Sequence, residues 1–98
     1  MKVFNLSEVE ITSRKNKVLQ REKEFNTRIV ELGAGGEIPE CEELDKYVLF
    51  IVLEGQAVAT VDGGQVKLAS GNMLTSEDAK LGLRTEQGVR MLGIQIEK

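Results

Sequence analysis

The fold is decided by residues 47–68, which read YVLFIVLEGQAVATVDGGQVKL. Residues 47–54 are apolar nearly throughout, and this predicts a central strand buried on both faces. Gly55 ends that strand, and residues 56–61 continue with small and β-branched side chains that favour a second one. The sequence Asp62-Gly63-Gly64 then predicts a tight hairpin turn, with residues 65–68 as the returning strand.

The rest of the chain repeats this pattern of short apolar segments separated by turn residues. The expected turns are Gly33-Ala34-Gly35-Gly36 and Gly71-Asn72, and the further expected strands are residues 27–32, 73–75, 80–84 and 89–96. Such regular spacing of strands and turns is typical of an all-β barrel or sandwich. We therefore predict an all-β fold.

The N-terminal stretch allows two interpretations. Residues 13–24 are rich in good helix formers and could form an amphipathic helix. Val18 and Leu19 alone give a narrow apolar stripe, however, so a strand over residues 17–21 is favoured. We expect one domain over residues 1–98, with an N-terminal strand or arm in residues 1–24 and the barrel in residues 25–98.

Composition excludes several classes of function. The net charge of -3 and pI near 5 argue against nucleic acid, whose binding relies on basic phosphate contacts. No apolar run approaches the roughly 20 residues that cross a bilayer, and residues 1–8 contain no signal segment. The single cysteine, Cys41, rules out an intrachain disulfide. These features predict a cytoplasmic protein without a membrane partner.

Charges are distributed unevenly along the chain. Basic residues gather at Arg14, Lys15, Lys17, Arg21 and Lys23, and acidic ones at Glu37, Glu40, Glu42, Glu43 and Asp45 around the only proline, Pro39. The simpler interpretation is two solvated surfaces, the second being an acidic loop around a turn at Pro39. The alternative is electrostatic complementarity between two copies in a homodimer, which would make dimerisation sensitive to salt.

The spacing of glycines and strands resembles that of a small single-domain cupin of the cupin-2 type. The first cupin motif is Gly, five residues, His-any-His, four residues, Glu, six residues, Gly. Its frame is met here by Gly35, Cys41-Glu42-Glu43, Val48 and Gly55. The second motif starts at Gly71, and its proline, glycine, histidine and asparagine positions fall on Glu77, Ala79, Gly82 and Glu86. The resemblance covers residues 27–98 and implies a double-stranded β-helix, or jelly-roll barrel, that forms homodimers.

The family usually works through a histidine-bound metal, and this chain has no histidine. The four ligand positions offer only a thiol at Cys41 and a carboxylate at Glu43, because Val48 and Gly82 carry no donor. Selective binding of zinc or iron needs three or four converging ligands. We therefore predict no metal and no other cofactor; a Cys41, Glu43 and Asp45 site is the alternative.

The same positions outline a candidate ligand pocket. We expect Cys41, Glu43, Tyr47, Val48, Gly82 and Arg84 near the barrel mouth, with Gly35, Gly55 and Gly71 as structural glycines. Cys41 is expected to be a small, partly buried residue rather than a reactive thiol. Lys80 and Arg84 would form a wall that recognises anions beside a gap left by Gly82, unless Arg84 pairs with Glu43 or lies on the surface.

Three functions fit these residues. The favoured one is a non-catalytic, homodimeric module that binds or senses a small organic ligand in the barrel. The second is an interaction or structural protein with a filled barrel. The third is a metal-dependent isomerase or dioxygenase with Cys and Glu ligands.

Overall fold

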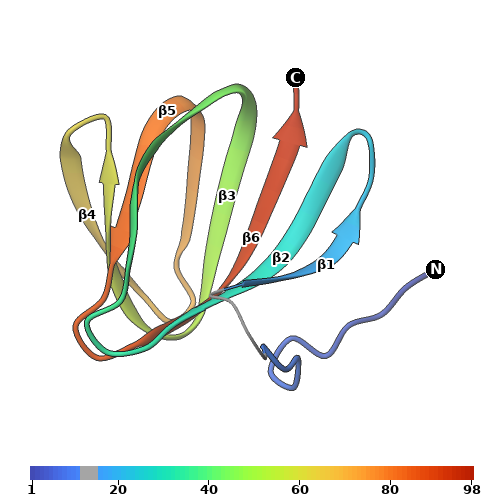
Figure 1. Ribbon diagram of the computed structural model, residues 1–98, viewed down its shortest axis with the longest axis horizontal. Helices are drawn as coiled ribbons and strands as arrows, with labels where there is room; N and C mark the ends of the chain where they lie inside the picture. The colour runs from blue at the N-terminus through green and yellow to red at the C-terminus, as the bar shows by residue number, and fades with distance from the viewer. Residues whose placement is uncertain (12–15) are drawn as a thin grey trace.

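The computed structural model describes residues 1–11 and 16–98, and its secondary structure consists of antiparallel strands. These strands are β1 (Asn16–Arg21), β2 (Phe25–Leu32), β3 (Glu37–Val61), β4 (Gly64–Ala69), β5 (Met73–Arg84) and β6 (Val89–Glu97) (Figure 1). Within the described ranges, no helix is long and apolar enough to cross a membrane. The predicted all-β fold is confirmed.

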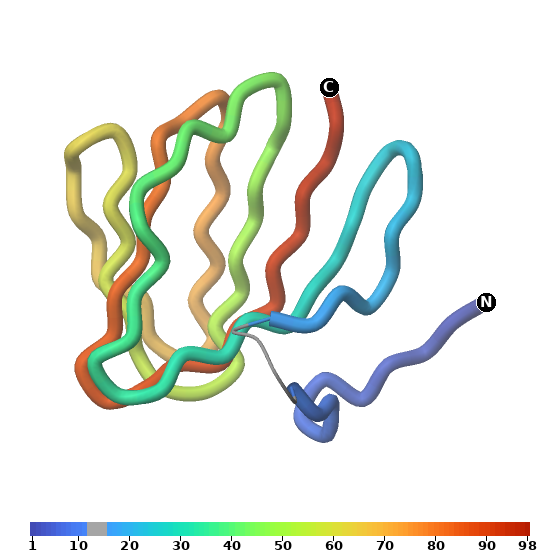
Figure 2. The backbone as a smooth tube through the Cα atoms, in the orientation of Figure 1, coloured from blue at the N-terminus to red at the C-terminus, as the bar shows by residue number. Residues whose placement is uncertain are grey.

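The sheet is rolled into two layers because β3 and β5 each contribute to both. Layer A contains β1, β2, β6, residues 46–55 of β3 and residues 73–77 of β5. Layer B contains residues 37–43 and 56–61 of β3, with residues 79–84 of β5 between them, and β4 at the far side. In Figure 2, the green and orange tubes turn over at the same edge of the molecule as they pass between layers.

Two aspartates make that turn. Asp45 and Asp78 both adopt positive φ, at 60° and 49°. Aspartate tolerates this left-handed region better than most residues. The backbone N–H of Asp45 donates to Oδ1 of Asp78 at 2.7 Å, and the β3–β5 register shifts between Glu43 and Tyr47. The two strands are therefore bent and joined at one corner.

Turn residues lie where the sequence predicts them. Val61 pairs with Gly64 across Asp62 and Gly63, whose φ values of 49° and 84° suit a two-residue hairpin. Gly35, Gly55 and Gly71 also have positive φ. At Gly55 a Cβ would lie 2.2 Å from the backbone oxygen of Gly88, so a side chain there would collide with the neighbouring backbone.

Several predicted boundaries are wrong. Residues 37–43 are not an acidic loop but a strand paired with β5, although Glu37, Glu40 and Glu42 are exposed to solvent as predicted. Pro39 is accommodated because this strand forms an edge with a register shift beside it. Gly55 bends β3 without ending it, and the strands expected at 73–75 and 80–84 are two halves of β5.

The N-terminal strand is confirmed as β1, which covers the predicted residues 17–21; residues 13–15 of the alternative helix lie outside the described residues, as do Arg14 and Lys15 of the basic cluster. Residues 6–9 of the arm are held against layer A by Arg90. Its guanidinium donates to the carbonyl oxygens of Leu6 (2.9 Å) and Val9 (2.5 Å) and pairs with Glu31.

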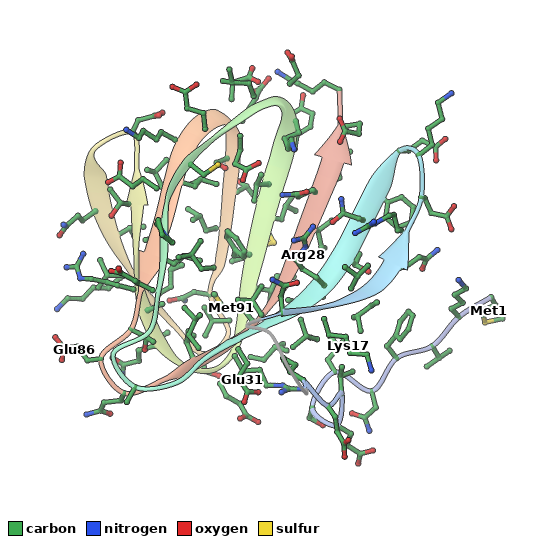
Figure 3. All side chains as sticks on the ribbon, in the orientation of Figure 1. Met1, Lys17, Arg28, Glu31, Glu86 and Met91 are labelled. Atoms are coloured by element: carbon green, nitrogen blue, oxygen red, sulfur yellow. The ribbon has the colours of Figure 1, made fainter. Side chains whose placement is uncertain are left out.

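The side chains inside the barrel are apolar at one end of its strands and polar at the other. One end, here called the apolar end, is formed by Val30, Leu32, Val52, Val89 and Met91, all buried in a single cluster. The other, the polar end, carries Asn26, Arg28, Glu43 and Gln95. Cross-strand pairs share a face, so the pairs Val30 with Met91 and Asn26 with Gln95 place the two ends on one inner surface. Figure 3 labels one residue of each end: Met91 on β6 at the apolar end and Arg28 on β2 at the polar end.

Residues 47–54 are buried on one face only. Val48 and Val52 point into the core, whereas Leu49, Ile51 and Leu53 are half-buried on the outer face of layer A. The prediction of burial on both faces is therefore wrong for the isolated chain.

Candidate functional site

A cavity of about 270 Å³ opens between the two layers at the polar end. Its lining residues are Asn16, Arg28, Val30, Glu37, Ile38, Pro39, Glu43, Val48, Phe50, Gly93, Ile94 and Gln95. They come from β1, β2, the first half of β3, the middle of β3, and β6. The cavity therefore exists only because β3 folds back over layer A.

Arg28, on β2, lines this cavity because side chains alternate between the two faces of a strand. It lies two residues before the buried Val30 and therefore shares its inward face. Its Nη2 donates to Oδ1 of Asn26 at 3.1 Å, and Nδ2 of Asn26 donates to Oε1 of Gln95 at 3.2 Å. This chain of hydrogen bonds fixes the guanidinium on the wall of layer A.

The Nε atom of Arg28 is buried and has no hydrogen-bond acceptor among the described residues. A buried donor without a partner costs about 1 to 3 kcal/mol, and more when it belongs to a charged group. Arg28 also makes no ion pair within the described part of the chain. The site thus holds a cation whose hydrogen-bonding capacity is incompletely used.

Gly93 makes room for the arginine. It is the cross-strand partner of both Arg28 and Phe50. A Cβ at this position would lie 3.2 Å from Cε1 of Phe50 and 3.4 Å from Cγ of Arg28. The missing side chain lets the aromatic ring and the arginine stem approach each other, so the cavity has an apolar floor beneath a charged wall.

Two carboxylates lie on the opposite side of the cavity, on β3. Glu43 is about three-quarters buried and pairs with Lys46 at 3.5 Å. Glu37 lines the cavity nearer the start of the strand. The cavity therefore carries positive charge on layer A and negative charge on layer B.

Of the six residues predicted to form the pocket, two line this cavity and four lie elsewhere. Glu43 and Val48 line the cavity. Cys41 is exposed, contrary to the expectation of partial burial, and its Sγ contacts the backbone oxygen of Glu42 at 3.8 Å. Tyr47 lies on the outer face of layer A, where Nζ of Lys98 sits 5.3 Å from the ring centroid.

Gly82 and Arg84 lie away from the cavity. They alternate with Leu81 and Leu83, whose side chains are buried, so positions 82 and 84 face outward. Gly82 leaves no interior gap, since a Cβ there would lie 2.9 Å from Cγ of Glu40 on the outer surface. The predicted wall of Lys80 and Arg84 is therefore outside: Lys80 pairs with Glu40 at 3.6 Å.

Arg84 instead borders an outer depression of about 630 Å³ together with Lys67, Glu86 and residues 55–58. Among the residues that the structure describes, no buried unpartnered group faces this depression. The polar end of the barrel is the better candidate site for that reason.

The donor set does not suit the metal that the cupin resemblance implies. Val48 presents only methyl groups, Gly82 faces outward, and Cys41 does not line the cavity. In the described residues, no three His, Cys, Asp or Glu side chains are grouped so as to hold a metal ion. The alternative site of Cys41, Glu43 and Asp45 is thus not assembled.

At the corner between the layers, ion pairing shifts the pKa values of Asp78 and Lys98. The side-chain hydrogen bond from Lys98 (2.8 Å), together with the backbone N–H of Asp45, lowers the pKa of Asp78 below 3.8. The same bond and the pair with Glu77 raise the pKa of Lys98 above 10.5. Both groups are exposed, so water screens these interactions.

Sequence reasoning missed Arg28, Asn26 and Gln95. The signal was present in residues 26–32, where strict alternation puts Asn26 and Arg28 on the same face as Val30 and Leu32. It was ambiguous because Ile29 is apolar and lies on the other face.

No protein-family model and no curated protein match this chain. Solved structures do. The cupin domain of Schizosaccharomyces pombe Cnp3 is 19% identical, with a TM-score of 0.88 over 98% of this chain and 69% of that one. An RmlC-like cupin protein from Desulfovibrio desulfuricans is 21% identical, with a TM-score of 0.83 over 98% and 96%. A cupin superfamily protein from Desulfitobacterium hafniense is 20% identical, with a TM-score of 0.82 over 96% and 88%. At these identities the likeness shows the fold alone: the chain is a small, single-barrel domain with the cupin fold.

Proposed function

We propose that this protein is a non-catalytic, metal-free binding module that takes a small organic molecule into the cavity at the polar end of the barrel. The observation that carries the proposal is Arg28, which lines the cavity and whose buried Nε lacks an acceptor among the described residues. Barrel mouths with an apolar floor and a few fixed polar groups are common ligand sites.

The residues around the cavity support binding rather than catalysis. The chain has no histidine to serve as a general base. Cys41 lies outside the lining, and Glu43 is occupied by Lys46. The alternative of an interaction protein with a filled barrel is less well supported, because space remains between the layers. The single exposed thiol fits the proposed cytoplasmic location.

We further propose that the module acts as a homodimer through the outer face of layer A. Tyr47, Met73 and Ile96 are 42%, 58% and 37% exposed on strands of this layer, beside the half-buried Leu49 and Ile51. An apolar face of this kind marks an interaction surface, and a two-fold axis would place it against its own copy.

Sedimentation equilibrium tests the dimer. Met73→Lys should shift the protein to monomers, whereas Leu44→Lys, at a residue 54% exposed near the corner between layers, should leave the dimer intact. A wild-type monomer at tens of micromolar would refute dimerisation. A dimer that is indifferent to salt would argue against the alternative of pairing between basic and acidic surfaces.

Binding is tested by ¹H–¹⁵N NMR with a panel of small anionic, neutral and cationic molecules. The proposal predicts that at least one probe shifts the amide signals of Val30, Val48 and Phe50, which line the cavity. Shifts confined to the outer depression around Arg84, or no response to any probe, would contradict it.

A further inference from the structure

We infer that the ligand of this cavity is a small monocarboxylate with an apolar body, held by a charge-assisted hydrogen bond from Arg28. This inference rests on the proposed function and assigns the ligand's chemical class. Arg28 is the one cation among the described residues that line the cavity.

The guanidinium offers the right donors. Arginine carries five N–H donors in a planar fork, and among the described residues this one donates a single hydrogen bond, from Nη2 to Asn26. Nε is buried without an acceptor, and no described carboxylate lies within 4.0 Å of the group. A ligand carboxylate would supply both the missing acceptor and the missing charge.

The floor of the cavity selects the body of the ligand. Val30, Val48 and Phe50 provide apolar surface in the same cavity as the guanidinium, and Gly93 leaves room for the ring of Phe50 and the stem of Arg28. A volume of about 270 Å³ suits a molecule of a few carbon atoms and excludes a nucleotide or a sugar phosphate of large size.

The opposite wall limits the ligand's charge. Glu37 and Glu43 line the cavity from β3. A second negative group on the ligand would lie beside these carboxylates in a partly desolvated space, where Arg28 is the one cation among the described lining residues and its charge is already matched by the first carboxylate. Dicarboxylates and phosphate dianions are therefore disfavoured relative to a monocarboxylate.

Arg28 is not explained by a structural role. Replacing Arg28 by an apolar side chain of similar length gives up the hydrogen bond to Asn26 but also removes the buried, unsatisfied Nε–H and its desolvated charge, which cost at least as much. Arg28→Met should therefore fold with an unfolding midpoint equal to or above that of the wild type. A residue that fixed the fold would behave in the opposite way.

Isothermal titration calorimetry with three matched probes tests the inference. The probes are 4-methylpentanoate, its neutral analogue 4-methylpentanamide, and the dianion glutarate. We expect 4-methylpentanoate to bind roughly tenfold or more tightly than either of the others, because one charge-assisted bond is lost with the amide and the second charge of the dianion finds no cation among the described lining residues.

Variants separate the possible outcomes. Arg28→Met should lose the preference for the carboxylate, while Arg84→Met, on the outer face, should bind like the wild type. If the amide binds in the cavity as tightly as the acid and Arg28→Met changes nothing, the inference fails while the proposed function stands. If no probe of any charge binds in the cavity, the proposed function fails as well.

Discussion

The apolar and polar ends of the barrel are built on the same strands and differ in what their inward side chains meet. On β2, Leu32 is 2% exposed within the main core, whereas Arg28, four residues earlier on the same face, borders a cavity. On β6, Met91 is fully buried while Gln95 joins a polar network. Stability and binding therefore belong to different stretches of the same strands, and substitutions should separate them.

The largest effect is expected at the apolar end. Leu32→Ala removes a buried side chain from a packed cluster and should lower the free energy of unfolding by about 2 to 5 kcal/mol. Urea unfolding followed by circular dichroism measures this. A loss below about 1 kcal/mol would mean that the apolar end is not the core that stabilises the barrel.

A matched pair on β3 sharpens the contrast. Val48 and Val52 both face inward, at 3% and 1% exposure, but only Val48 lines the cavity. Val52→Phe has no space to fill and should cost about 1 to 3 kcal/mol. Val48→Phe can extend into the cavity, so it should cost less and abolish binding of 4-methylpentanoate. Equal losses of stability in the two variants would show that the cavity is not available to a side chain.

The smallest effect concerns acid stability at the corner between the layers. Because the pKa of Asp78 is lowered in the folded state, its contribution is present above 3.8 and is lost as the pH falls through the lowered pKa. Asp78→Asn keeps an acceptor for the N–H of Asp45 and tolerates the positive φ.

The wild type should therefore lose stability more steeply than Asp78→Asn when urea midpoints are compared between pH 6 and pH 2. The difference should be small, since the carboxylate is exposed. Parallel curves for the two proteins would show that the Lys98 bond does not persist in solution.

Local chemistry made much of the fold predictable. The turn at Asp62 and Gly63 depends on backbone angles that these two residues tolerate, and Gly55 and Gly71 mark bends for the same reason. Residues 37–43 were misassigned because their partner strand lies some 40 residues later in β5. An acidic segment around a proline looks like a loop until that pairing is known.

The site was less predictable because it depends on which face each residue takes. The corner at Asp45 and Asp78 shifts the register, so motif spacing placed Gly82 and Arg84 inside when alternation puts Leu81 and Leu83 there. Glu43 and Val48 do line the cavity, and they lie on the part of the motif frame that precedes this corner or follows it directly. Arg28 required knowing which face of β2 is covered by layer B.

The most direct test of the account is the side-chain Nε–H signal of Arg28, observed by ¹H–¹⁵N NMR during titration with 4-methylpentanoate. We predict that this signal moves downfield and exchanges more slowly with water as the carboxylate binds, in parallel with the amides of Phe50 and Gly93. A signal that stays unchanged while the ligand saturates the protein would contradict the central claim that Arg28 holds the ligand.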